Sequence, residues 1–456
     1  MVFCHNACAC EVCEVRRAKS EERSTGSELG VWGVGRMPPH GTFSANVGNV
    51  DTNVLRSLPP ASLYHARYIQ LSYIDMVTPT RAVASSGSSD LLRRSLYLPL
   101  GLLAVYTTFF IALLTPTLQR HFIFLHAVQF PFFPSFDQPH KYGLAPGKTR
   151  ALHLDTRDGE RIGVWHVLPE IAYQSLVARE ETMEAGQFDE SVYETAMREY
   201  PTVLYLHGNA MHRAAPWRIA AYSALTSRMD VNVVAIDYRG FGDSSGSPSE
   251  AGVVEDAHTA YRWIKQQQGQ SSQGVTLFGQ SLGTGIAAIL ATQLAEHDEV
   301  GVVLMAPYAN LRSLVSDFRL GGVLPLLAPV KAIPFHESIL DRCMQTRLDT
   351  LATLPRFISA PHTGRLVLLH ARDDPVIPFS HSHRLFRALH GAANKPAIHS
   401  RNMPGFAHIQ RFQPSSTADD ATVTLIETHF GGHNQLTEGA LDLVRLALRL
   451  PSHLSP

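Results

Sequence analysis

The sequence predicts an α/β protein with a mostly parallel central sheet. Residues 202–206, 232–236 and 300–305 are short, continuous apolar runs that end in turn-forming residues. Such runs are typical of strands that are buried on both faces. Residues 250–267 place their apolar side chains on one helical face, as expected of a helix that joins two parallel strands. The predicted fold class is therefore α/β.

The composition allows one large domain with additional segments. The chain has 456 residues, of which 45% are hydrophobic, as in ordinary globular proteins. The net charge is −1, and only 17% of the residues are charged. A nucleic-acid partner is not expected, because the sequence lacks the basic excess that such proteins carry.

An uncharged apolar stretch precedes the predicted domain. The segment 95–116 is long enough to cross a bilayer as a helix, which takes about 20 residues. Arg93 and Arg94 come before the stretch, and Arg120 follows it. The alternative is a buried core helix, but a soluble helix of this length normally keeps a polar face. We therefore expect a single transmembrane helix.

The flanking charges predict how this helix is oriented. Arg81, Arg93 and Arg94 on the amino-terminal side outnumber Arg120 on the other side. Under the positive-inside rule this favours a cytosolic amino terminus. We expect a single-pass membrane protein of the endoplasmic reticulum with its catalytic domain in the lumen.

The remaining segments divide the chain further. Residues 1–90 are rich in Ser, Gly, Pro and Thr and are predicted to form a disordered tail. Residues 117–145 form a linker whose aromatic residues suit either the membrane interface or packing on the domain. The domain is predicted to span 146–450, with a helical cap at about 308–360. The tail also holds a cysteine cluster that could bind a metal or carry lipid, without a second cluster to complete a site: Cys4, Cys8, Cys10 and Cys13.

Ser281 is the candidate nucleophile. It lies in Gly279-Gln280-Ser281-Leu282-Gly283, between an apolar strand and a segment of helical composition. A sharp strand-to-helix turn holds its central residue in a strained conformation, and the flanking glycines avoid collisions there. The hydroxyl would then lie at a helix amino terminus, where free N–H groups stabilise negative charge.

An acid and a base are expected downstream. The apolar run from Arg365 ends in Asp373 and Asp374; Asp374 is the predicted acid and Asp373 the alternative. His408 is the predicted base, because it follows a short strand and a Pro-Gly turn at the expected end of the sheet. Competing histidines lie nearby: His381, His383, His390 and His399.

Backbone groups near Ser281 are predicted to form an oxyanion hole. One donor would be the N–H of Leu282, and the second would be that of Asn209 or Ala210, in the loop after the strand at 202–206. His207 precedes this loop and is expected to be structural. Asp237 and Arg239 are expected to form a structural ion pair or turn cap.

The order Ser281, Asp374, His408 is that of α/β-hydrolases, and residues from about 145 to 450 resemble that fold. More narrowly, the chain resembles the membrane-anchored monoacylglycerol and lysophosphatidylserine lipases of the α/β-hydrolase-domain group. Gln280 stands where that branch more often has His. The motifs that carry the resemblance are His207-Gly-Asn-Ala, Asp237-Tyr-Arg-Gly-Phe-Gly, Gly279-Gln-Ser-Leu-Gly-Thr and His370-Ala-Arg-Asp-Asp-Pro-Val-Ile-Pro.

The resemblance implies a membrane-anchored serine hydrolase that cleaves carboxylic esters of lipids, such as a monoacylglycerol or a lysophospholipid. A Ser-His-Asp triad works through an acyl-enzyme and requires no metal or cofactor. Two other functions remain open. One is a protein depalmitoylase or other thioesterase with the same triad, and the other is a catalytically silent hydrolase fold that serves as a membrane scaffold.

Overall fold

The computed structural model describes residues 86–450 except 184–185, 272, 318–326 and 415–419. The predicted amino-terminal tail therefore lies almost entirely outside the described residues, and so does its cysteine cluster.

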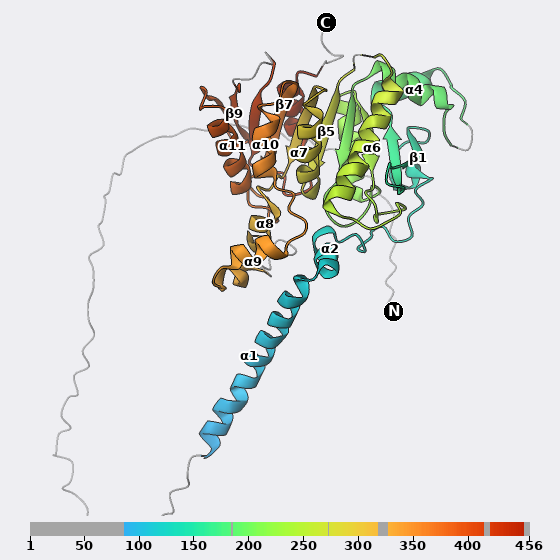
Figure 1. Cartoon of the computed structure of the whole chain (residues 1–456). Coiled ribbons are helices and arrows are strands. Elements are labelled where there is room, and N and C mark those ends of the chain that lie inside the picture. The colour runs from blue at the N-terminus through green and yellow to red at the C-terminus, as the bar shows by residue number, and fades with distance from the viewer. Residues whose placement is uncertain (1–85, 184–185, 272, 318–326, 415–419, 451–456) are drawn as a thin grey trace, which may run out of the picture. The chain divides into compact units, whose positions relative to one another are not determined.

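A ten-stranded sheet forms the centre of the domain (Figure 1), in the order β1-β2-β4-β3-β5-β6-β7-β10-β9-β8. Strands β4, β3, β5, β6, β7 and β10 are parallel, while β1, β2, β9 and β8 extend the sheet with antiparallel pairs. The strands are β1 Thr149–Asp155, β2 Arg161–Val167, β3 Thr202–Leu206, β4 Asn232–Ile236, β5 Val275–Gln280, β6 Val300–Met305, β7 Thr363–Ala371, β8 His399–Met403, β9 Ala407–Phe412 and β10 Val423–Thr428.

Helices follow most of the strands. The α-helices are α1 Ser86–Leu113, α2 Pro116–Phe124, α3 Glu170–Ala178, α4 Glu190–Glu199, α5 Pro216–Arg228, α6 Glu250–Gln268, α7 Leu282–Leu294, α8 Leu311–Asp317, α9 His336–Cys343, α10 Thr350–Phe357, α11 Ser380–Ala392 and α12 Glu438–Leu448. Two short 3-10 helices, η1 Pro139–Tyr142 and η2 Ala328–Ala332, complete the described elements.

Each face of the sheet is covered by its own helices. Leu204 and Leu206 of β3 point to the face covered by α6, α7, α10 and α11 (Figure 1), whereas Val203 and Tyr205 point to the face covered by α5 and α12. Successive strand residues alternate between faces, so a strand covered on both sides is apolar throughout. The predicted α/β fold with a mostly parallel sheet is therefore confirmed.

Helix α1 contains the predicted span. Its segment Arg93–Leu113 is long and apolar enough to cross a membrane and is not buried in the domain. Pro99 lies inside the helix, and the helix ends at Leu113, slightly before the predicted boundary at 116. Pro116 begins α2 instead, where a proline is well tolerated because no N–H is needed.

The segment at 117–145 packs partly on the domain. Phe124 is fully buried in the core that faces α6 and α7. Phe136 is buried against Trp165, whose indole N–H donates to the Phe136 carbonyl at 2.8 Å. The aromatic rings of Phe132 and Phe133, in contrast, are exposed. Part of the segment therefore packs on the domain, and part faces outward.

The predicted cap region also divides into two parts. Helices α8 and α9 extend from the body of the domain (Figure 1). Helix α10, however, packs on α7, and its Leu354 and Phe357 are buried in the main core. The residues near 350–357 thus form part of the helical layer over the sheet.

The carboxyl-terminal strands differ from the expected arrangement. The strand before His408 is predicted to be the last strand of the chain, but residues 399–412 form the edge hairpin β8–β9 and a further strand follows them. The later strand β10 returns between β9 and β7 and pairs with β7 in parallel. This arrangement decides which histidine reaches the serine.

Candidate active site

Ser281 lies at the tip of a strained turn between β5 and α7. Its φ and ψ angles are 51° and −116°, an unusual conformation for a residue with a side chain. A Cβ on Gly279 would press on the carbonyl of Gly283, and one on Gly283 would collide with the carbonyl of Leu206. Both flanking glycines are therefore required by close backbone contacts.

His433 connects Ser281 to Asp374. Its Nε2 lies 3.1 Å from the Ser281 Oγ, and its Nδ1 lies 2.8 Å from the Asp374 Oδ2. With Nδ1 donating to the carboxylate, Nε2 is free to accept the serine proton. The structure thus brings together Ser281 and Asp374, as predicted, with a histidine that the sequence reasoning did not select.

The Asp374 carboxylate is held in its charged form. Burial alone would raise its pKa, but contacts with His370 and His433 and a backbone hydrogen bond from Ile377 hold this pKa well below its usual range. The Oδ1 accepts from the N–H groups of Val376 and Ile377 at 2.8 and 2.9 Å. The turn after β7 therefore fixes the carboxylate opposite the imidazole.

Asp373, the alternative acid, has a different position. Its Oδ1 accepts the N–H of Gly432 at 2.8 Å, next to His433 in the chain. Its carboxylate therefore holds the loop that carries the histidine.

The prediction of His408 as the base is wrong in this structure. His408 lies on the edge strand β9, where its Nε2 is 2.8 Å from the Ser400 Oγ. Its Nδ1 is 3.9 Å from Glu427, too far for a hydrogen bond. The carboxyl ends of parallel strands meet at one edge of the sheet, and the strand beside β7 is β10. The loop after β10, which carries His433, therefore reaches Ser281.

A sequence signal for His433 does exist. Val423–Thr428 is a short strand-like run, and Gly431-Gly432-His433 follows it as a glycine turn with a histidine. His408 belongs to the same kind of pattern, a short strand followed by a glycine turn and a histidine. Local sequence cannot choose between them, because the choice depends on which strand pairs with β7.

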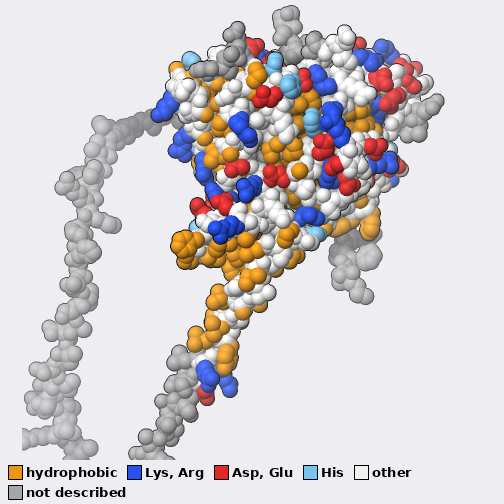
Figure 2. Space-filling model, in the orientation of Figure 1, with side chains coloured by type: hydrophobic (Ala, Val, Ile, Leu, Met, Phe, Trp, Pro, Cys, Tyr) orange, Lys and Arg blue, Asp and Glu red, His pale blue; other side chains and the backbone are white. Residues whose placement is uncertain are grey.

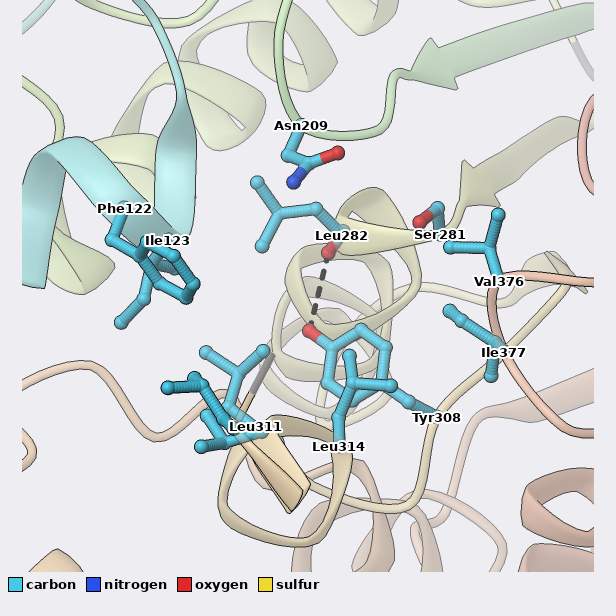
Figure 3. Close-up of a pocket in the computed structure, with 12 residues that line it drawn as sticks. Phe122, Ile123, Asn209, Ser281, Leu282, Tyr308, Leu311, Leu314, Val376 and Ile377 are labelled. Atoms are coloured by element: carbon cyan, nitrogen blue, oxygen red, sulfur yellow. Dashed lines mark hydrogen bonds between the residues drawn. The ribbon is translucent and has the colours of Figure 1, made fainter. Parts of the chain in front are cut away.

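One of the predicted oxyanion donors is excluded. The N–H of Ala210 donates to the carbonyl of Phe124 at 2.9 Å, and that of Met211 donates to the carbonyl of Val128 at 2.7 Å. Asn209 lines the pocket together with Ser281 and Leu282 (Figure 3). Leu282 is the first residue of α7, where the N–H has no partner within the helix. Leu282 and Asn209 therefore remain as candidate donors, and Ala210 does not.

Buried charges support the loop that carries Asn209. The Arg218 guanidinium donates to the carbonyls of Gly208 and Ala210 at 3.1 and 2.9 Å. His207 is fully buried, with its Nε2 3.4 Å from Asp237. Burial, together with the nearby Arg218, lowers the pKa of His207 to about 4, so this ring is neutral at physiological pH. These contacts agree with the structural role expected for His207.

Asp237 and Arg239 do not pair with each other. Asp237 accepts from Arg213 at 2.6 Å. Arg239 instead pairs with Asp256 at 2.8 Å and Asp158 at 2.6 Å. Both residues therefore have structural ion pairs, as expected, but each belongs to its own network and anchors its own turn.

An apolar pocket opens beside Ser281 (Figure 3). Phe122 and Ile123 of α2 lie across this pocket from Ser281. The hydroxyl of Tyr308 donates to the Leu282 carbonyl at 3.3 Å, so it does not break the apolar lining with a free polar group. The remaining apolar wall is formed by Leu311, Leu314, Val315, Leu327, Val376 and Ile377.

Among the described residues, no group of three or more His, Cys, Asp or Glu side chains is arranged to hold a metal ion. The polar groups that surround the serine are those of the triad-like arrangement and of the loops that support it.

Comparison with known proteins places the chain in a family. Residues 199–359 match the protein family described as serine aminopeptidase, S33. The lysophosphatidylserine lipase ABHD12 of Xenopus tropicalis is 33% identical over 287 residues, which cover 61% of this chain and 67% of that protein. The human protein ABHD12B is 30% identical over 338 residues, covering 72% of this chain and 80% of that protein. The chain belongs to the ABHD12 family of α/β-hydrolases.

The chain spans about two thirds of the length of the ABHD12 lipases that it matches. A solved structure, the esterase Pf2001 of Pyrococcus furiosus, is 15% identical, with a TM-score of 0.42 over 70% of this chain and 94% of that one. Together with the family match, membership of the ABHD12 family identifies the enzyme class of the chain, which is a serine ester hydrolase.

Proposed function

We propose that this protein hydrolyses carboxylic esters of single-chain lipids at a membrane. Ser281 is the nucleophile, His433 the general base and Asp374 the residue that orients the imidazole. The observation that carries the proposal is the continuous contact from Asp374 through His433 to Ser281, at 2.8 and 3.1 Å, beside an apolar pocket.

The proposed mechanism follows from these positions. His433 removes the Ser281 proton as Oγ attacks the ester carbonyl, and Asp374 stabilises the resulting imidazolium. The N–H groups of Leu282 and Asn209 bind the oxyanion, and losing one such donor typically costs about 10²–10³ in rate. His433 then protonates the leaving alcohol, and water hydrolyses the acyl-enzyme by the same route.

The pocket and the relatives support a lipid substrate. An acyl chain gains about 0.8 kcal/mol for each buried CH₂ group, and the apolar walls described above offer such burial. The ABHD12 relatives are named lysophosphatidylserine lipases. A lysophospholipid is therefore our first candidate, and a monoacylglycerol is the second.

We also propose that α1 spans the membrane of the endoplasmic reticulum once, with the domain in the lumen. The arginines on the amino-terminal side of the span support this orientation. Digestion of intact microsomes by protease tests it. Protection of the domain is expected, and its digestion in intact vesicles would contradict the luminal assignment.

Labelling of the full chain with a fluorophosphonate tests the nucleophile and the base together. The wild-type protein should label, Ser281→Ala should not, and His433→Ala should label far more slowly. His408→Ala is the matched control and should label like wild type. Failure of the wild type to label would favour the silent scaffold.

Hydrolysis of lysophosphatidylserine, monoacylglycerol and a palmitoylated peptide then separates the substrate classes. Release of fatty acid from either lipid is the expected result. Turnover of the peptide alone would show a thioesterase in place of a lipase.

A further inference from the structure

Large aromatic side chains are exposed on two segments, the loop after α2 and the start of α9. Phe132 and Phe133, in the loop after α2, are 71% and 98% exposed. Phe335, directly before α9, is 82% exposed. Figure 2 shows hydrophobic side chains gathered over α9 and along α1. Exposed apolar groups that gather in this way mark an interaction surface, whereas isolated ones are ordinary.

A buried glutamine of α2 ties the end of α9 to the end of the candidate span. The Gln119 Nε2 donates to the carbonyls of Leu113 at 3.4 Å and Cys343 at 3.2 Å. Its Oε1 accepts the N–H of Gln345 at 2.8 Å. Leu113 is the last residue of α1, and Cys343 is the last residue of α9. The carboxyl end of α9 is therefore held where the chain leaves α1.

We propose that Phe132, Phe133 and Phe335 form a second membrane contact, in which their rings lie in the interface of the bilayer that α1 crosses. The proposal rests on the membrane anchor proposed above. Continuity with α1 favours a lipid surface over a protein partner, because Gln119 keeps α9 beside the end of the span. Aromatic rings are favoured at the depth of the lipid headgroups.

The contact is hydrophobic and has no electrostatic attraction to anionic lipid. Helix α9 carries Glu337, Asp341 and Arg342, so it has no positive excess. Binding to anionic headgroups requires clustered Lys and Arg. The contact should therefore form on neutral phosphatidylcholine and should not weaken as salt is raised.

This contact also gives the substrate a route to the serine. Helix α2 begins just after the span at Pro116, and its Phe122 and Ile123 form a wall of the pocket beside Ser281. An acyl chain that leaves the bilayer along α2 reaches the pocket without crossing bulk water. The substrate class that this arrangement fits is an ester whose acyl chain is embedded in the membrane.

Fluorescence quenching tests the contact without relying on catalysis. The full chain is reconstituted in vesicles of brominated phosphatidylcholine, with Phe133→Trp or Phe335→Trp. The control is Leu446→Trp on α12, an exposed site at the opposite end of the strands from Ser281. There Arg365, near the start of β7, donates to the Leu448 carbonyl. The emission that the added tryptophan contributes, over that of the wild-type protein, should be quenched more at 133 and 335 than at 446. Equal quenching at all three sites would overturn the proposal, whether or not the enzyme hydrolyses lipid.

Activity provides a second measurement. The double variant Phe133→Ser with Phe335→Ser should lose hydrolysis of a long-chain ester in vesicles and keep hydrolysis of a short soluble ester. Leu446→Ser should keep both. Unchanged rates on both substrates would refute the role in substrate delivery. An equal loss on both would also refute it, because the damage would then lie in the fold of the enzyme.

Discussion

His433 is held in place through the residues on either side of it. Asn434 accepts a hydrogen bond from the Gln280 Nε2 at 2.7 Å, and the Gln280 Oε1 accepts the Tyr205 hydroxyl at 3.1 Å. Gln280 is buried and directly precedes Ser281. The Gln280 side chain therefore links the loop that carries His433 to the turn that carries Ser281.

Gln280→Ala should accordingly lower kcat by about tenfold with little change in KM, because a lost buried hydrogen bond costs about 1–2 kcal/mol and the acyl pocket is untouched. Steady-state kinetics of Gln280→Ala, Asn434→Ala and the double variant measure this. The double variant should be no slower than the slower single variant. Additive losses would show that the two side chains act independently.

The two histidine candidates predict opposite results in ester hydrolysis. His433→Ala should lower kcat/KM by about 10³-fold or more, because it removes the group that accepts the serine proton. His408→Ala should stay within a factor of about two, since surface changes usually perturb a protein only weakly. A large loss in His408→Ala with an active His433→Ala would reverse the assignment.

Two of the three residues of the proposed triad could be predicted from local sequence. Ser281 and Asp374 each follow a buried apolar strand in a distinctive turn, so neighbouring residues identify them. His433 depends on the pairing of β10 with β7, a contact between segments far apart in the chain. Local sequence also could not choose between Asn209 and Ala210 as the second oxyanion donor, because the N–H of Ala210 donates to the carbonyl of Phe124 in a distant segment.

At the scale of elements, the packing of α7 on β3 positions Ser281, the proposed nucleophile. Gly283 of α7 lies directly against the carbonyl of Leu206, the last residue of β3. Strands β3 to β7 could be predicted because each is largely apolar, whereas β10 was not, because its run Val423–Thr428 contains Thr424, Glu427 and Thr428. The order of the last strands could not be predicted, because β8 of the edge hairpin β8–β9 is mostly exposed and carries polar residues.

Gly283→Ala should therefore lower the free energy of unfolding by about 3 kcal/mol, because the added methyl group forces α7 away from β3. Fluorophosphonate labelling should fall with it. Gly391→Ala in α11 is the matched control: a Cβ there meets no atom within 4 Å. The control should be neutral or stabilising by up to about 1 kcal/mol, as alanine favours helices. Thermal unfolding of both variants checks this, and equal melting temperatures would contradict it.

At the scale of the whole molecule, buried histidines predict sensitivity to acid. Burial and the nearby Arg150 lower the pKa of His166 to about 3, and that of His207 is lowered to about 4. The unfolded chain binds these protons near pH 6.5, whereas the folded protein does not. Between about pH 6.5 and 4 each histidine should therefore reduce stability by about 1.4 kcal/mol for each pH unit lost.

Denaturant midpoints measured between pH 7 and 5 test this expectation. His166→Gln removes one titrating group and keeps a donor for Asn232, which His166 contacts at 2.9 Å. Its stability should fall less steeply with acid than that of the wild type. An unchanged slope would mean that His166 takes up no proton on unfolding.

A shortened protein that starts at residue 146, the predicted domain boundary, should fold poorly and label slowly with fluorophosphonate. It loses the buried Phe124 and Phe136 and the backbone partners of the loop that carries Asn209. A protein that starts at Pro116 keeps them and should label like the full chain in detergent. Equal labelling of the two shortened proteins would contradict this expectation.

The backbone bonds from Ala210 to Phe124 and from Met211 to Val128 have a mechanical consequence. In the membrane orientation that we propose, the segment that leaves the bilayer is bonded directly to the loop that carries Asn209, a candidate oxyanion donor. We therefore expect tension or tilt of α1 to reach this loop along α2, close to Ser281. If the proposed anchor holds, the turnover rate should then change with the thickness and curvature of the bilayer.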